Sequence, residues 1–230
     1  MSWPTKKLGE VCELVRGTEP GSEKYFDEFR KDRVRFIRVQ DLTGKLDNPK
    51  FVNKSLKHLT LVKSSEILIS FDGTPGIVVR GWEGAISSGI RVIRNIKPQM
   101  LNGFLFYYLQ TPPVQEVIKF YTTGVTILHA SRAIPHIKIL VPPLKIQCQI
   151  VERLDAIKKA QELNDKQIAL AEELFQSLLH RELDPKGKNW EKKKLGDLAE
   201  VFNGKTAPKD AYTKDGVPII KVILTKKHSY

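Results

Sequence analysis

The opening sequence of this chain occurs twice, and a long segment without helix-breaking residues separates the two copies. Residues 3–11 (WPTKKLGEV) reappear at a constant offset as residues 190–198 (WEKKKLGDL). A weaker match aligns residues 34–39 with residues 217–222 when the second copy is four residues shorter in between. Internal similarity of this kind indicates repeated structural units. The sequence therefore predicts one complete module, a rod, and the opening of a second module.

The positive charge of the chain is concentrated in the modules. The formal net charge is +12. Residues 146–185 hold 5 Lys and Arg against 8 Asp and Glu, whereas the remainder of the chain holds 33 against 18. Basic modules joined by an acidic rod favour binding of a polyanion by the modules. The alternative is a cation-rich surface that has no partner.

Several classes of protein carry sequence signatures that this chain lacks. No apolar run approaches the roughly 20 residues of a membrane span, and the N-terminus has no apolar signal-peptide core. Cys12 and Cys148 form no metal-ligand spacing, and a reducing cytoplasm is the expected location. Glycine-rich nucleotide cradles and the Asn/Asp-Pro-Pro-Tyr run of adenine methyltransferases are also missing. We therefore expect no catalytic residues, no metal and no cofactor.

The first module has the sequence pattern of a mixed α+β fold. Hydrophobic alternation and turn residues predict short strands in a curled sheet with helices beside it. Residues 8–15 fit either a strand or a short helical turn, and residues 42–61 are expected to form a loop. The other expected strands lie at 34–40, 66–71, 77–80, within 85–95 and at 136–141, and the expected helices at 101–110 and 114–121. The strand at 77–80 is the expected hairpin partner of 66–71, across a turn at residues 72–76 (DGTPG).

The rod, residues 146–183, contains neither Gly nor Pro, and its apolar residues recur at alternating spacings of four and three. This spacing predicts the seam of a coiled coil, and polar seam residues such as Gln161 and Asn164 fix register. A helix of this length extends roughly 55 Å, and its seam requires a partner helix. The expected partner contacts are Ile150, Leu154, Ile157, Ile168, Phe175 and Leu178.

Four features occur in a specific order along the chain. The opening Trp-x-x-x-x-Leu-Gly-Glu/Asp occurs at Trp3 and again at Trp190, and the first expected strand continues as FIRVQD at residues 36–41. The first module closes on IPHIKILVPPL at residues 134–144, and the heptad helix carries FQSLL at residues 175–179 before the module restarts. Because these four features occur in this order, the chain resembles the specificity subunit of type I restriction–modification enzymes.

The resemblance implies that residues 1–145 form a target recognition domain that binds double-stranded DNA. It also implies that residues 146–185 are a conserved coiled-coil spacer and that residues 186–230 begin a second recognition domain, left incomplete. Members of this family read one half of a bipartite DNA site with each domain and tether methyltransferase and restriction subunits, without catalysis of their own. Self-association through the helix is a further expectation. A coiled-coil scaffold or adaptor with incidental basic charge remains the alternative.

DNA contacts are expected on polar loops next to the strands of the first module. Lys and Arg bind phosphates, whereas Arg grips guanine and Gln or Asn grips adenine through paired hydrogen bonds. For any one residue, a solvated surface position is the alternative interpretation. The candidates are Arg16, Lys24, Arg30, Arg33, Arg38, Gln40, Thr74, Ser87, Ser88, Arg91, Thr123, Thr126, His129 and Arg132.

Overall fold

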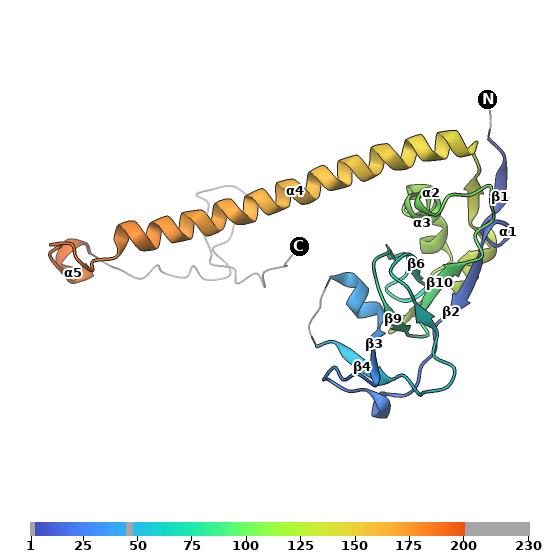
Figure 1. The fold of residues 1–230 in the computed structure, drawn as a ribbon, viewed down its shortest axis with the longest axis horizontal. Helices are drawn as coiled ribbons and strands as arrows, with labels where there is room; N and C mark the ends of the chain where they lie inside the picture. The colour runs from blue at the N-terminus through green and yellow to red at the C-terminus, as the bar shows by residue number, and fades with distance from the viewer. Residues whose placement is uncertain (1–2, 45–47, 201–230) are drawn as a thin grey trace, which may run out of the picture. The chain divides into compact units, whose positions relative to one another are not determined.

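The structure, a computed structural model, describes residues 3–44 and 48–200. The chain divides into two compact units, residues 1–160 and residues 161–230. Within the described residues, all strands lie in the first unit, together with several short helices (Figure 1). The α+β fold class predicted from the sequence is confirmed.

One antiparallel sheet of the first unit has the strand order β2–β10–β6–β8. The central strands are buried along nearly their whole length, and Ser70 of β6 and Arg91 of β10 are buried together with the apolar residues of these strands. The predicted hairpin between residues 66 and 80 is confirmed, because β6 and β8 pair antiparallel. The strands are β2 (Glu13–Arg16), β6 (Ile67–Ser70), β8 (Val78–Val79) and β10 (Ile90–Arg94).

A second sheet has the order β4–β3–β9–β5, in which β3 and β9 run parallel and the other neighbours antiparallel. The prediction of a loop at residues 42–61 is therefore wrong for residues 50–53, which form β4, and for residue 61, which begins β5. These short strands carry a weak hydrophobic pattern of their own and are defined by pairing with their neighbours. The strands are β3 (Arg33–Ile37), β4 (Lys50–Asn53), β5 (Leu61–Val62) and β9 (Gly84–Ile86).

The segment expected to contain one strand within residues 85–95 forms β9 and β10, which belong to different sheets. The chain changes sheet at residues 87–89, where its backbone lies close to other segments. A Cβ atom on Gly17 would lie 2.0 Å from the Ser87 carbonyl oxygen, and one on Gly89 would lie 2.8 Å from Cγ2 of Val39. Glycine at both positions permits this close approach, which hydrophobic alternation alone does not reveal.

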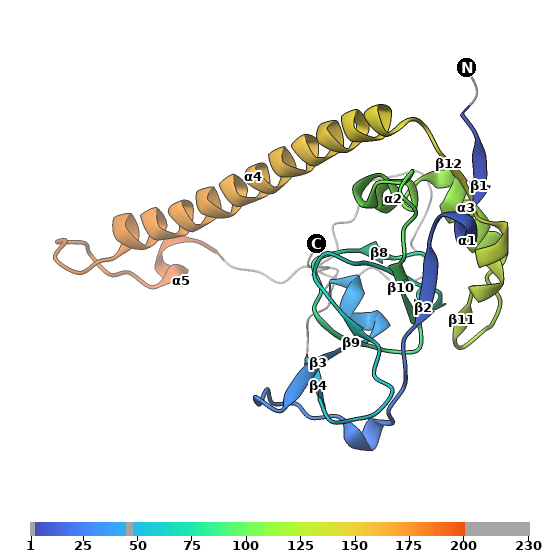
Figure 2. The same ribbon diagram turned by 45° about the vertical axis from the view of Figure 1, so that its right-hand side comes forward.

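Two short ribbons connect distant parts of the first unit. Strand β1 (Thr5–Lys7) pairs with β12 (Lys138–Leu140), and both are labelled in Figure 2. Strand β7 (Asp72–Gly73) pairs with β11 (Leu128–His129). Helix α3 begins at Pro112 rather than at the expected Val114, because Pro is favourable at the first helical positions. The helices are α1 (Leu8–Val11), α2 (Asn102–Tyr108) and α3 (Pro112–Phe120), and the 3-10 turns are η1 (Ser22–Lys24), η2 (Val39–Thr43) and η3 (Ser131–His136).

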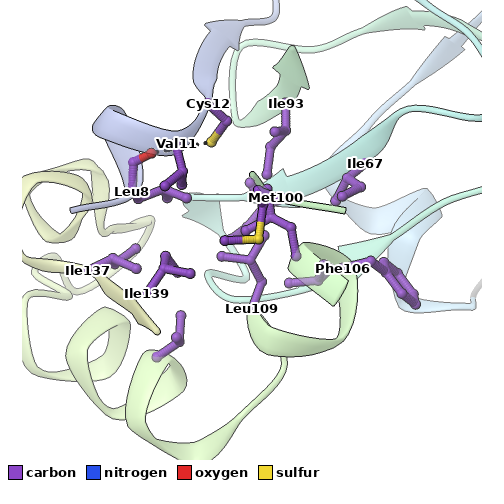
Figure 3. Packing of buried hydrophobic residues seen from close by; sticks show 14 of the residues in the cluster. Leu8, Val11, Cys12, Ile67, Ile93, Met100, Phe106, Leu109, Ile137 and Ile139 are labelled. Atoms are coloured by element: carbon purple, nitrogen blue, oxygen red, sulfur yellow. Dashed lines mark hydrogen bonds between the residues drawn. The ribbon is translucent and has the colours of Figure 1, made fainter. Parts of the chain in front are cut away.

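The main hydrophobic core joins the beginning and the end of the first module (Figure 3). Leu8 and Val11 of α1 lie in one cluster with Leu109, Ile137 and Ile139, and all five side chains are fully buried. The Leu8 N–H also donates to the Ile137 carbonyl oxygen at 2.9 Å. Burial of each such side chain contributes about 1.5–3 kcal/mol, so closure of the module is strongly stabilised.

The long helix α4 (Leu144–Leu183) begins before the predicted residue 146, and its first turns pack onto the first unit. Ile150, predicted as a partner contact, packs against the main core. Asp155 accepts hydrogen bonds from the Tyr107 hydroxyl and from Arg80, whose Nη2 lies 3.0 Å from Oδ1. The Tyr107 hydrogen bond is the main cause that lowers the pKa of Asp155, and Arg80 adds to it against the opposing effect of burial.

Gln147 anchors the start of α4. Its side chain is fully buried, and its Nε2 donates to the carbonyl oxygens of Gln99 at 2.8 Å and Pro142 at 2.7 Å. Its Oε1 accepts from the Leu101 N–H at 2.8 Å. One side chain thereby satisfies backbone groups on both sides of the α2–α4 contact.

We expect Gln147→Leu to lower the free energy of unfolding by about 2–4 kcal/mol, because it leaves buried backbone donors and acceptors without partners. Urea denaturation followed by circular dichroism measures the change. The matched control is Gln176→Leu on the exposed part of the same helix, which should change stability by less than about 0.5 kcal/mol. Equal effects of the two substitutions would contradict the anchoring role.

Further along α4 the seam residues are exposed. The exposed fraction is 57% for Ile157, 66% for Ile168, 57% for Phe175 and 37% for Leu178, whereas Leu154 is half-buried. An apolar stripe of this spacing on a long helix is typical of a coiled-coil surface. Contact of these residues with a partner helix stays a prediction.

The repeated opening sequence adopts the same local structure in both copies. In α1 the Lys7 N–H donates to the Glu10 carboxylate at 2.6 Å, and in α5 (Leu195–Leu198) the Lys194 N–H donates to the Asp197 carboxylate at 3.3 Å. Both lysines have the same extended backbone, with ψ of 149°. An acidic residue at the third helical position satisfies a backbone donor in each helix start. The weaker repeat at residues 217–222 lies outside the described residues.

Candidate nucleic-acid interface

Five of the predicted contact residues line one hollow of the first unit, with a volume of about 450 Å³. They come from segments far apart in the sequence, namely the end of β2, the start of β10 and the region from the end of α3 to η3. Pairing of β2 with β10 and of β7 with β11 brings these segments together. The lining residues are Arg16, Asp72, Arg91, Thr123, His129, Ser131 and Arg132.

The hollow is electrically positive. Arg16 and Arg91 are directly paired across β2 and β10, and like charges in this position repel each other. The Asp72 carboxylate offsets part of this charge, at 3.9 Å from Arg16 Nη2 and 2.8 Å from His129 Nδ1. With Arg132, three arginines and one aspartate line the hollow, so the site is suited to an anion such as a phosphate.

The three arginines have different roles. Arg91 is buried and donates to the carbonyl oxygen of Ser88 at 2.8 Å and to Oγ of Ser131 at 3.0 Å, so it holds the walls together. Burial is the main cause that lowers the pKa of Arg91, and the charge of Arg16 acts in the same direction. The Arg16 side chain is 63% exposed. Arg132 is exposed, and no hydrogen bond or ion pair engages its side chain among the described residues, so the charges of Arg16 and Arg132 are accessible from solvent.

Arg38 and Gln40, two of the residues expected to contact DNA, lie together at η2. Asp41 orients Arg38 by accepting from its backbone N–H at 2.8 Å and from its Nη2 at 3.0 Å. The same Nη2 donates to the Asn48 carbonyl oxygen at 3.0 Å. With its amide oxygen turned to the guanidinium, Gln40 accepts from Arg38 at 3.0 Å. Arg38 is therefore held by a buried carboxylate, and Gln40 is the exposed member of the pair.

The predicted cations before β3 have contrasting surroundings. Lys24 on η1 and Arg30 are exposed, and their nearest acidic partners lie 4.0 and 3.9 Å away on exposed side chains. Arg33 is buried, its Cζ lies 3.5 Å from the centroid of the Phe26 ring, and its Nη1 donates to the Glu28 carbonyl oxygen at 3.0 Å. Lys24 and Arg30 are thus available to a ligand, whereas Arg33 stabilises the module.

The predicted hydroxyl residues are also distributed over several positions. Ser87 is buried, and Ser88 offers its carbonyl oxygen to Arg16 and Arg91. Thr126 is exposed in the loop that precedes β11. Thr74 lines a second hollow, of about 540 Å³, beside α3.

The sequence reasoning missed two residues of the first hollow. Asp72 was assigned only to a turn, and Ser131 was not singled out. The Asp72 carboxylate is hydrogen-bonded to His129 Nδ1, and the Ser131 hydroxyl accepts a hydrogen bond from Arg91. The only signal in the sequence was that each lies next to an expected strand or loop, because their partners are 57 and 40 residues away.

Within residues 3–44 and 48–200, no group of three or more His, Cys, Asp or Glu side chains is placed to hold a metal ion. In the part of the chain that the structure describes, no helix combines the length and apolar character needed to cross a membrane.

Solved structures of specificity subunits share this fold. The HsdS subunit from Thermoanaerobacter tengcongensis aligns with a TM-score of 0.55 and 22% identity, covering 82% of this chain and 45% of that chain. The S subunit of a type I restriction–modification system from M. genitalium aligns with a TM-score of 0.56 and 16% identity, covering 81% of this chain and 47% of that chain. The fold is therefore that of type I specificity subunits.

Curated relatives agree with this class. The type I restriction enzyme MjaVIII specificity subunit of Methanocaldococcus jannaschii is 24% identical over 237 residues, which cover 96% of this chain and 54% of the relative. The putative MjaX specificity subunit of the same organism is 30% identical over 200 residues, covering 77% and 45%. This chain spans about half the length of these relatives. The model of the type I restriction modification DNA specificity domain matches residues 1–173, and the chain belongs to this family.

Proposed function

We propose that the chain recognises one half of a bipartite site in duplex DNA and that residues 1–145 form the recognition domain. The observation that carries this proposal is the convergence of Arg16, His129 and Arg132 on one positive hollow. Guanidinium groups bind phosphate oxygens through paired, charge-assisted hydrogen bonds. Membership of the specificity-domain family supports the same function.

The proposed interface divides positioning from sequence reading. Contacts to phosphates fix the register of a protein on DNA, whereas contacts to base edges carry the specificity. Arg16 and Arg132 contact phosphates at the hollow. Arg38 holds the amide oxygen of exposed Gln40, so the Gln40 amide N–H groups face outward as donors to a base edge, such as N7 of a purine.

The remaining segments serve assembly. Residues 146–185 form the coiled-coil spacer, and residues 186–230 begin a second recognition domain. The exposed apolar stripe of α4 supports a role in tethering methyltransferase subunits and, through the assembled enzyme, the restriction subunit. In this proposal the chain is not catalytic, and cleavage and methylation belong to the other subunits.

A coiled-coil scaffold with incidental basic charge is the second candidate, and the exposure of Ile168 and Phe175 favours it. A scaffold needs no DNA contact at the hollow. The two functions therefore differ in the effect of substitutions at Arg16 and Arg132.

We expect the double substitution Arg16→Gln with Arg132→Gln to weaken binding to a labelled duplex of random sequence about 10- to 100-fold at low salt, because two charge-assisted phosphate contacts are lost. Fluorescence anisotropy measures the affinity. The control is Arg153→Gln with Lys166→Gln on exposed positions of α4, which removes the same charge. An equal loss in both variants, or no binding by the unmodified chain, would favour the scaffold.

A further inference from the structure

The loop before β11 presents apolar side chains next to the positive hollow. The exposed fraction is 100% for Val125, 57% for Ile127 and 81% for Phe120 at the end of α3. Single exposed apolar residues are ordinary on protein surfaces. Here three exposed apolar residues lie within one short stretch, residues 120–127. Such a cluster is more typical of a binding surface than of an ordinary loop.

The backbone holds this loop in a defined shape. The Thr123 N–H donates to the His129 carbonyl oxygen at 2.9 Å, and the His129 N–H donates to the Thr123 carbonyl oxygen at 2.7 Å. Gly124 has φ of 109°, and a Cβ atom there would lie 2.1 Å from the Ile127 carbonyl oxygen. Only glycine fits this turn. Val125 and Ile127 are therefore held at the tip of a closed loop and stay out of the core.

The base of the loop belongs to the hollow. Thr123 and His129, the residues that close the loop, line the hollow together with Arg16 and Arg132. The loop therefore adjoins the arginines, and a ligand whose anionic groups bind there also lies against the loop. When duplex DNA binds with its phosphates at the base of the loop, the edge of a DNA groove lies at the tip of the loop.

We propose that Val125 and Ile127 form an apolar wedge that enters duplex DNA and partly unstacks one base step. This inference rests on the proposed function. Proteins that bend DNA insert apolar side chains of this kind between base steps and stabilise the distorted duplex through phosphate contacts beside them. Charge complementarity favours DNA as the partner that covers the loop and the hollow, because its phosphates supply anions to Arg16 and Arg132. An uncharged protein surface would bury these two charges without a counter-charge.

The experiment compares two duplexes that differ only in a central T·T mismatch, where the unstacking cost is already reduced. The full chain should bind the mismatched duplex about tenfold more tightly than the paired duplex at low salt. In Val125→Ser with Ile127→Ser this ratio should fall to about one, while affinity for the paired duplex changes little. Both substitutions lie on exposed side chains, so the core is unaffected.

Leu61→Ser is the control variant, because Leu61 is 53% exposed at another place in the same unit, and it should keep the mismatch preference. An unchanged ratio in the loop variant would overturn the wedge while leaving the DNA-binding function standing. The wedge is also overturned if the loop variant keeps the preference but loses binding to a methyltransferase subunit. Failure of the unmodified chain to bind either duplex would overturn the proposed function and the wedge together.

Discussion

Binding of the chain to duplex DNA should weaken about a thousandfold when monovalent salt rises from roughly 50 to 200 mM. Lys and Arg outnumber Asp and Glu by 33 to 18 outside residues 146–185. Each phosphate that a cation neutralises releases condensed counterions, so the logarithm of affinity falls with the logarithm of salt by about 0.9 per contact. About six contacts give the expected loss.

The structure provides exposed cations for these contacts, among them Arg16, Lys24, Arg30, Lys119 and Arg132. Fluorescence anisotropy at several salt concentrations gives the slope, which should be near −5. The variant Arg16→Gln with Arg132→Gln should make the slope shallower by about two. An affinity that stays constant across this range of salt would count against phosphate binding by the module.

Local signals in the sequence located many elements of the fold but not their partners. The β6–β8 hairpin was predicted because Gly73 and Gly76 mark a turn between two apolar runs, and both have positive φ. The switch of sheet at residues 87–89 depends on contacts with Gly17 and Val39. Such contacts join residues remote in sequence, so alternation along one segment carries no trace of them.

For the candidate site, too, the sequence indicated local features but not the contacts between remote residues. Some of the polar residues chosen next to expected strands lie on segments that meet, since Arg16 and Arg91 are opposite each other on paired strands. Their contact with DNA stays a prediction. Charge alone did not separate exposed arginines from buried ones. Arg33 is covered by the Phe26 ring, and Arg91 donates to Ser88 and Ser131 within the fold. Only the packing shows that these two have a structural role and that Arg132 is exposed.

Self-association through α4 is expected for the unmodified chain at micromolar concentration, most simply as a two-fold dimer. Ile157, Ile168, Phe175 and Leu178 expose an apolar stripe along the helix. A stripe of roughly several hundred Å² exceeds what monomers usually tolerate, and its burial at about 25 cal/mol per Å² contributes several kcal/mol. Light scattering should give twice the chain mass of 26.2 kDa.

The seam also predicts how the two copies align. Gln161 and Asn164 lie at its middle, and an antiparallel pair centred between them places Ile157 of one copy opposite Ile168 of the other. Ile157→Asp with Ile168→Asp places two pairs of carboxylates opposite each other in the seam of the dimer, and their repulsion and desolvation should leave only monomers. Ala156→Asp with Ser177→Asp adds the same charge on the opposite face of the helix and should stay dimeric. A monomeric mass for the unmodified chain, or a dimer in the seam variant, would sink this prediction.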